Sequence, residues 1–89
     1  MAFKSQDLSV IAYANGFTLW HYSTIDLASG IDTNGYFNSA SDMLRIGDVI
    51  FANTDTDGSP ATGILNVSAN NLGVVDVADM TQIGTLNTD

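Results

Sequence analysis

Residues 8–23 read LSVIAYANGFTLWHYS, and this stretch decides the fold class. Two runs of mostly aliphatic and aromatic residues, Leu8–Ala14 and Phe17–Ser23, stand on either side of Asn15-Gly16. An Asn-Gly pair between two such runs predicts a two-residue type I′ turn, in which both residues need positive φ angles. We therefore predict a β-hairpin over these residues.

The second run of this hairpin is apolar on both faces. In a strand, Phe17, Leu19 and His21 would share one face, and Thr18, Trp20 and Tyr22 would share the other. Neither face is polar throughout. We therefore expect the strand to be covered on both sides, either by the chain's own fold or by a neighbouring subunit.

The middle of the chain predicts a loop followed by one short helix. Residues 25–35 are rich in Asp, Ser, Thr, Asn and Gly, which is typical of a loop. Asn38 or Ser39 can cap a helix that runs to Leu44, and residues 45–47 end it with a cation followed by glycine. A helix of about two turns is unstable alone, so it must pack against the sheet.

Three later apolar runs predict further strands. They cover residues 49–52, 64–69 and 74–78, and the turn-forming residues 70–73 predict a second hairpin between the last two. We expect a mainly β fold, a small antiparallel sandwich or partly open barrel of about five to six short strands with one short helix.

The chain has 89 residues and no cysteine. This length predicts a single β-rich domain over residues 1–89, frayed at both termini. A domain of this size has a small core and often gains stability from disulfides, a metal or association. Because disulfides are excluded, we expect a homo-oligomer.

The net charge of −8 comes from ten aspartates against Lys4 and Arg45. Two cations cannot neutralise a run of phosphates, so we expect no nucleic-acid partner. The same charge repels anionic lipids, and no apolar run approaches the length of a transmembrane helix, so we expect no membrane partner. No signal peptide is expected either, which predicts synthesis in the cytoplasm.

The residue inventory predicts no catalytic site and no cofactor. Acid–base and nucleophilic catalysis rely on His, Glu, Lys or Cys side chains. This chain has one histidine, one lysine and neither glutamate nor cysteine. His21 lies inside a predicted strand, and we interpret it as a structural histidine.

Residues 53–58 match the first half of a calcium loop, with oxygen ligands at alternate positions and glycine sixth. The twelfth position is Ile64, where a bidentate glutamate is required. We therefore interpret the loop Asn53–Gly63 as a solvated turn and predict no metal, although contact of this loop with a metal or a partner stays open.

The aromatic residues carry the main prediction of a functional surface. Trp and Tyr are enriched at the desolvated centres of interfaces. The alternative is ordinary core packing. We predict a subunit interface that uses side chains from the first half of the chain, namely Trp20, Tyr22, Tyr36 and Phe37.

Four segments resemble short virion proteins of tailed bacteriophages and prophages: Ala12–Tyr22, Gly35–Asn38, Asp42–Leu44 and Gly47–Ile50. The resemblance covers residues 6–52. It implies a structural protein of the virion that acts as a decoration, cement or fibre-base subunit on the head, with a capsid or other virion protein as partner. The implied role also favours a trimer as the form of the homo-oligomer.

Three other functions remain open. The first is a head–tail or tail component of the same particle. The second is a glycan-binding module for host surfaces, in which exposed rings stack on sugars. The third is a cytosolic adaptor or inhibitor that acts on a basic partner.

Overall fold

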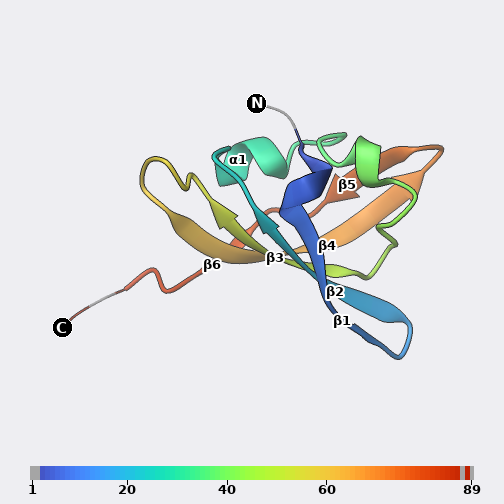
Figure 1. The fold of residues 1–89 in the computed structure, drawn as a ribbon, viewed down its shortest axis with the longest axis horizontal. Helices are drawn as coiled ribbons and strands as arrows, with labels where there is room; N and C mark the ends of the chain where they lie inside the picture. The colour runs from blue at the N-terminus through green and yellow to red at the C-terminus, as the bar shows by residue number, and fades with distance from the viewer. Residues whose placement is uncertain (1–2, 87, 89) are drawn as a thin grey trace.

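The computed structural model describes residues 3–86 and residue 88. The ends that we predict to be frayed include residues 1, 2, 87 and 89, which lie outside the described residues. The strands are β1 (Leu8–Ala14), β2 (Phe17–Ser23), β3 (Val49–Thr54), β4 (Ala61–Asn71), β5 (Val74–Val77) and β6 (Thr81–Ile83) (Figure 1). A one-turn helix α1 (Ala28–Ile31) and two 3-10 turns (Ser5–Asp7 and Asn38–Ala40) complete the elements.

The hairpin predicted from residues 8–23 is confirmed. Strands β1 and β2 pair antiparallel, with Ala14 opposite Phe17. Asn15 and Gly16 both have positive φ angles, 28° and 93°, as a type I′ turn requires. In Figure 1 this hairpin projects from the body of the protein at the lower right.

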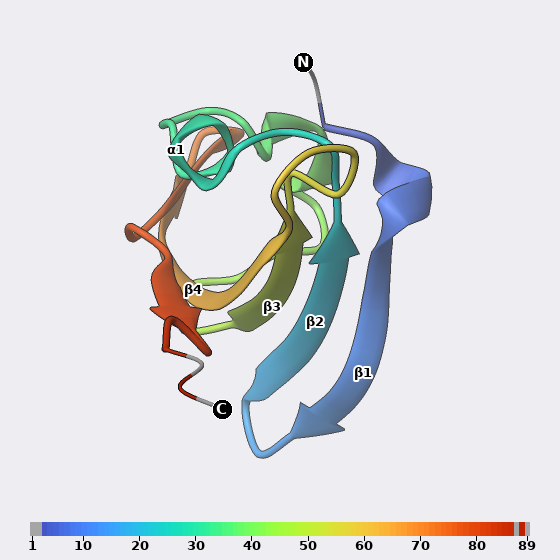
Figure 2. The same ribbon diagram turned by 90° about the vertical axis from the view of Figure 1, so that its left-hand side faces the viewer.

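The six strands form one open, curved sheet in the order β1-β2-β3-β4-β5, with β6 also paired to β4 (Figure 2). The predicted fold class is confirmed: the chain is mainly β, with short strands and one short helix. The sheet is mixed, because β2 and β3 run parallel while the other pairs are antiparallel. Parallel neighbours need a long connection, and here residues 24–48 provide it.

The connection between β2 and β3 covers the concave side of the sheet, above the strands in Figure 2. It contributes Ile31, Phe37 and Leu44, all fully buried or nearly so. These residues join the core cluster with inward side chains of the strands: Leu8, Trp20, Tyr22, Ile50, Ala52, Leu65, Val67, Val75 and Val77. One face of the sheet and the long connection thus share one core.

The short helix lies in a different place from the predicted one. We expected a helix from residues 38–39 to Leu44, but that segment is a 3-10 turn at Asn38–Ala40 followed by further turns. Asn38 caps nothing; its Oδ1 accepts the backbone N–H of Val75 in β5 at 2.9 Å. The helix α1 lies inside the predicted loop, where burial of Ile31 outweighs the turn-forming composition.

Asp48 fastens the end of the connection to the hairpin. Its buried carboxylate accepts the backbone N–H of Thr18 at 3.0 Å, the Trp20 indole N–H at 3.1 Å and the backbone N–H of Arg45 at 3.1 Å. A buried carboxylate is stable only when hydrogen bonds satisfy it, as these do. Asp48 also closes a turn at Gly47, where its N–H bonds the Arg45 carbonyl oxygen.

Within the described part of the chain, no helix combines the length and apolarity needed to cross a membrane.

Candidate interaction surface

Strand β1 lies at one edge of the sheet. Within residues 3–86, β2 is the only strand that pairs with it. Every β1 residue except Leu8 is exposed. Alternate N–H and C=O groups of an edge strand point away from the sheet, so such a strand offers a template on which another strand can pair.

Most of the exposed side chains of this hairpin are apolar. Val10, Ile11 and Tyr13 are 56%, 52% and 66% exposed, and Phe17, just after the turn, is 37% exposed. We call these four residues the hairpin edge. Natural edge strands are commonly protected by lysine, proline, inward-pointing charges or a β-bulge. Strand β1 has no lysine, proline or charged residue, and its one device of this kind is a register shift between Val10 and Ala12, which leaves Ile11 without a partner in β2.

The two faces of β2 are unequally covered. Thr18, Trp20 and Tyr22 are buried on the concave side. On the convex side Leu19 and His21 are only partly buried, beside the exposed Phe17. The chain's own fold therefore covers one face of this strand, and the alternative, that a neighbouring subunit covers the other face, stays a prediction.

Charge is separated along the hairpin. Residues 8–25 contain no aspartate, lysine or arginine. Asp7 precedes β1 and Asp26 follows β2 at the other end of the hairpin from the turn, where the N–H of Asp55 also bonds the carbonyl oxygen of Asp26 at 2.9 Å. The hairpin is thus neutral toward its turn and acidic at its opposite end.

Three of the four aromatic residues predicted to form an interface lie in the core. Tyr22 and Phe37 are at most 1% exposed, with ring centroids 5.3 Å apart, and Trp20 is 6% exposed. Their rings follow the core-packing alternative and present almost no surface to a partner. Sequence reasoning missed the residues of the hairpin edge, although the mostly apolar, uncharged run of β1 was a signal for them.

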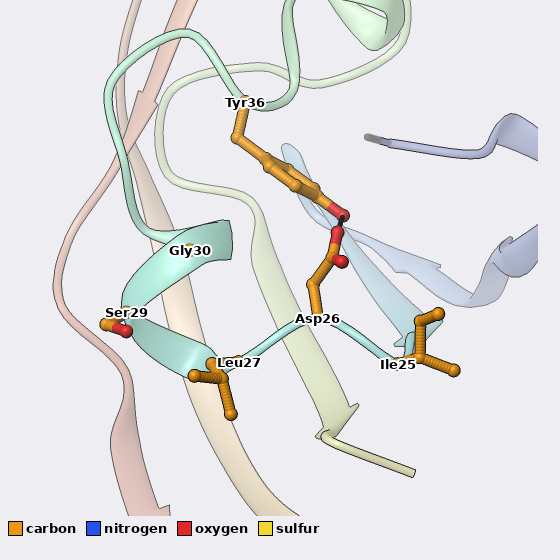
Figure 3. A pocket seen from close by; sticks show the side chains of 6 residues that line it. All are labelled: Ile25, Asp26, Leu27, Ser29, Gly30 and Tyr36. Carbon is orange, nitrogen blue, oxygen red and sulfur yellow. Dashed lines mark hydrogen bonds between the residues drawn. The ribbon is translucent and has the colours of Figure 1, made fainter. Parts of the chain in front are cut away.

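Tyr36, the fourth, lines a shallow pocket of about 380 Å³ beside α1 (Figure 3). The other residues that line the pocket are Ile25, Asp26, Leu27, Ser29 and Gly30. The Tyr36 hydroxyl donates to Asp26 Oδ2 at 2.6 Å and lies 2.9 Å from the Tyr22 hydroxyl. Figure 3 shows the Tyr36 ring reaching toward Asp26 from the far side of the pocket.

The chemistry of this pocket is that of a fixed hydrogen-bond chain. Burial and the hydrogen bond to Asp26 raise the pKa of Tyr36 well above its usual value, so the phenol keeps its proton at neutral pH. A phenol that stays protonated is a hydrogen-bond donor and a poor base. The hydrogen bond between Tyr36 and Asp26 therefore holds Tyr36 against the start of the connection between β2 and β3.

The remaining candidate groups also make bonds within the fold. His21 Nε2 lies 2.9 Å from Asn53 Nδ2, and Asn53 Oδ1 accepts the Thr62 hydroxyl at 2.7 Å, so a polar row crosses β2, β3 and β4. In the predicted loop at 53–63, Asp55 Oδ2 accepts the N–H of Ser59 at 3.1 Å. Among the described residues, no three His, Cys, Asp or Glu side chains lie close enough together to hold a metal ion.

Comparisons of the chain with protein-family models, with curated proteins and with solved structures found no match.

Proposed function

We propose that this chain is a non-enzymatic structural protein of a phage virion, which binds the capsid surface and associates with itself. The observation that carries the proposal is the hairpin edge, an exposed apolar strand with one free side. Such edges are sites of strand addition, in which main-chain hydrogen bonds supply affinity and alternate side chains supply specificity.

The composition supports a structural role. With one histidine, one lysine and no glutamate or cysteine, the chain is poor in groups that perform catalysis. Polar side chains such as the buried Asp48 and the partly buried Tyr36 are engaged in hydrogen bonds that hold the fold. What remains available is contact surface.

The proposed place is the outside of the head, as decoration, cement or fibre base. A net charge of −8 suits a protein that faces away from packaged DNA, because it would be repelled by the phosphates. A head–tail or tail position in the same virion is the alternative.

Imaging of purified particles tests this proposal. Particles of the phage or prophage that encodes the chain would be purified, analysed for the protein by mass spectrometry and imaged by cryo-electron microscopy. We expect regular density for the protein on the capsid surface. Virions that lack the protein contradict the proposal, and density at the head–tail joint or tail supports the alternative.

A glycan-binding module is less well supported by the structure. Sugar binding by stacking needs exposed rings, and Trp20, Tyr22 and Phe37 are buried. Tyr13 is the most exposed of the described aromatic rings. Binding of the purified protein on a glycan array, lost on Tyr13→Ala, would favour this function over capsid binding.

A further inference from the structure

We infer that a second copy of this chain covers the hairpin edge, with the two β1 strands paired antiparallel about a two-fold axis near Ile11. The inference deepens the self-association part of the proposed function and rests on it. Ile11 lies at the middle of β1, Leu8–Ala14, at the register shift where it has no partner in β2, and an antiparallel pair centred there overlaps the two strands along their whole length.

The charge distribution favours a copy of the same chain as the occupant. Two molecules that each carry a charge of −8 repel one another, and they can approach most closely where neither carries a charged side chain. Residues 8–25 are such a region, and in this region β1 has its free edge. A partner selected by opposite charge would instead favour the acidic end near Asp7 and Asp26.

The same charge distribution favours an antiparallel over a parallel arrangement of the two β1 strands. In a parallel pair, the Asp7 residues that precede the two β1 strands would lie side by side, together with the acidic end around Asp26 and Asp55. In an antiparallel pair, the acidic end of each copy lies beside the neutral turn of the other. The two Asp7 residues then stand about 26 Å apart, at the strand rise of about 3.3 Å per residue.

Antiparallel pairing of identical strands is also a closed arrangement. The same surface is used on both copies, so each dimer uses both of its β1 edges and leaves no β1 edge for a third copy. Val10, Ile11 and Tyr13 of each copy come next to the partner strand, where cross-strand apolar pairs stabilise a sheet. The pairing thereby covers the β1 edge, which in the monomer is exposed and open to aggregation.

The test is the mass of the purified full-length chain by size-exclusion chromatography with light scattering. We expect the wild-type protein at twice its monomer mass of 9.4 kDa. Ile11→Asp places two carboxylates beside the axis and should give the monomer. Ile46→Asp is the matched control, because Ile46 is 65% exposed, carries the same change in charge and lies outside the hairpin; it should stay dimeric.

A mixing experiment then tests the symmetry. Ile11→Asp and Ile11→Lys should each be monomeric alone and should form a mixed dimer when combined, since residue 11 of one copy faces residue 11 of the other. Circular dichroism confirms that each variant is folded. A monomeric wild type, a trimer, or a dimer that survives Ile11→Asp overturns the inference.

These outcomes are separate from those of the proposed function. A chain that is monomeric in solution but present on imaged capsids refutes the two-fold pairing and leaves the structural role intact. A chain that dimerises as described but is absent from virions keeps the pairing and refutes the role.

Discussion

Leu72 has an unfavourable backbone conformation for its side chain. It stands with Gly73 in the two-residue turn between β4 and β5, with φ of 55°, and its side chain is 96% exposed. A left-handed conformation costs an ordinary residue about 1–2 kcal/mol, while asparagine tolerates it well. An exposed side chain loses no buried apolar surface on replacement.

We therefore expect Leu72→Asn to stabilise the chain by about 1 kcal/mol, which corresponds to a rise in Tm of about 4–8 °C for a domain of this size. Thermal unfolding followed by circular dichroism measures it. Leu72→Val is the control and should lower Tm, because a β-branched residue tolerates positive φ poorly. An unchanged Tm for Leu72→Asn would show that the turn is not strained.

Because the pKa of Tyr36 is raised in the fold, the free energy of unfolding should depend on pH in the alkaline range. In the unfolded chain this phenol has the ordinary tyrosine pKa of about 10, whereas burial and the hydrogen bond to Asp26 keep it protonated in the fold. Above about pH 10 the unfolded state releases a proton that the folded state retains, so the free energy of unfolding falls as pH rises.

Tyr36→Phe should remove this part of the pH dependence. At pH 7 it should also lower the free energy of unfolding by about 1–2 kcal/mol, because Asp26 loses a hydrogen-bond donor. Urea unfolding at several values between pH 7 and 11 measures both effects. We expect the wild-type curve to fall more steeply than the variant curve; parallel curves would contradict the assignment.

At the scale of elements, the close approach of β6 to β4 depends on Gly63. A Cβ at this position would lie 2.5 Å from Met80 Cγ and 2.7 Å from the carbonyl oxygen of Thr81. Gly63 pairs with Gln82 in β6, so the backbone has to move to admit even a methyl group.

Gly63→Ala should cost about 1–3 kcal/mol and separate β6 from the sheet. Hydrogen exchange at residues 81–83 should become faster, while exchange in β1 and β2 stays slow. Gly30→Ala is the matched control, because nothing lies within 4 Å of the added Cβ and alanine favours α1. If exchange in β6 were unaffected by Gly63→Ala, the tight contact would be contradicted.

The elements that the sequence predicts correctly are those with a local cause. Asn15-Gly16 fixes a turn whatever surrounds it, so the first hairpin follows from the sequence alone. Helix α1 has no such signal; its turn exists because Ile31 enters the core. Asn38 looks like a helix cap but bonds Val75, 37 residues away, which no local pattern shows.

The candidate surface was only partly predictable for a related reason. Strands β1 and β2 have similar apolar runs, and their difference in exposure arises because β3 pairs with β2 and leaves β1 at the edge. Strand β3 pairs with β2 because the connection of residues 24–48 brings it there, and sequence patterns did not predict the path of this connection. The aromatic rings were consequently expected at the surface, whereas the fold buries Trp20 and Tyr22.

At the scale of the whole molecule, the charge of −8 predicts a salt dependence. Two like-charged copies repel less when ions screen them, and the Debye length falls from about 10 Å at 0.1 M salt to about 3 Å at 1 M. We expect the Kd of the dimer to fall several-fold between 0.05 M and 0.5 M NaCl. Analytical ultracentrifugation measures it, and a dimer weakened by salt would indicate an interface held by opposite charges.

From the parallel ladder between β2 and β3 we predict the order in which the chain folds. The β1–β2 and β4–β5 hairpins join neighbours in sequence, and isolated hairpins form in about 1–10 μs. The β2–β3 ladder has to wait until the 24–48 connection has closed its loop, and contacts between distant residues are the slow ones. Asp48 accepts hydrogen bonds from Thr18 and Trp20 across that ladder. We therefore expect these bonds to form late in folding, when the β1–β2 hairpin joins the strands that follow the connection.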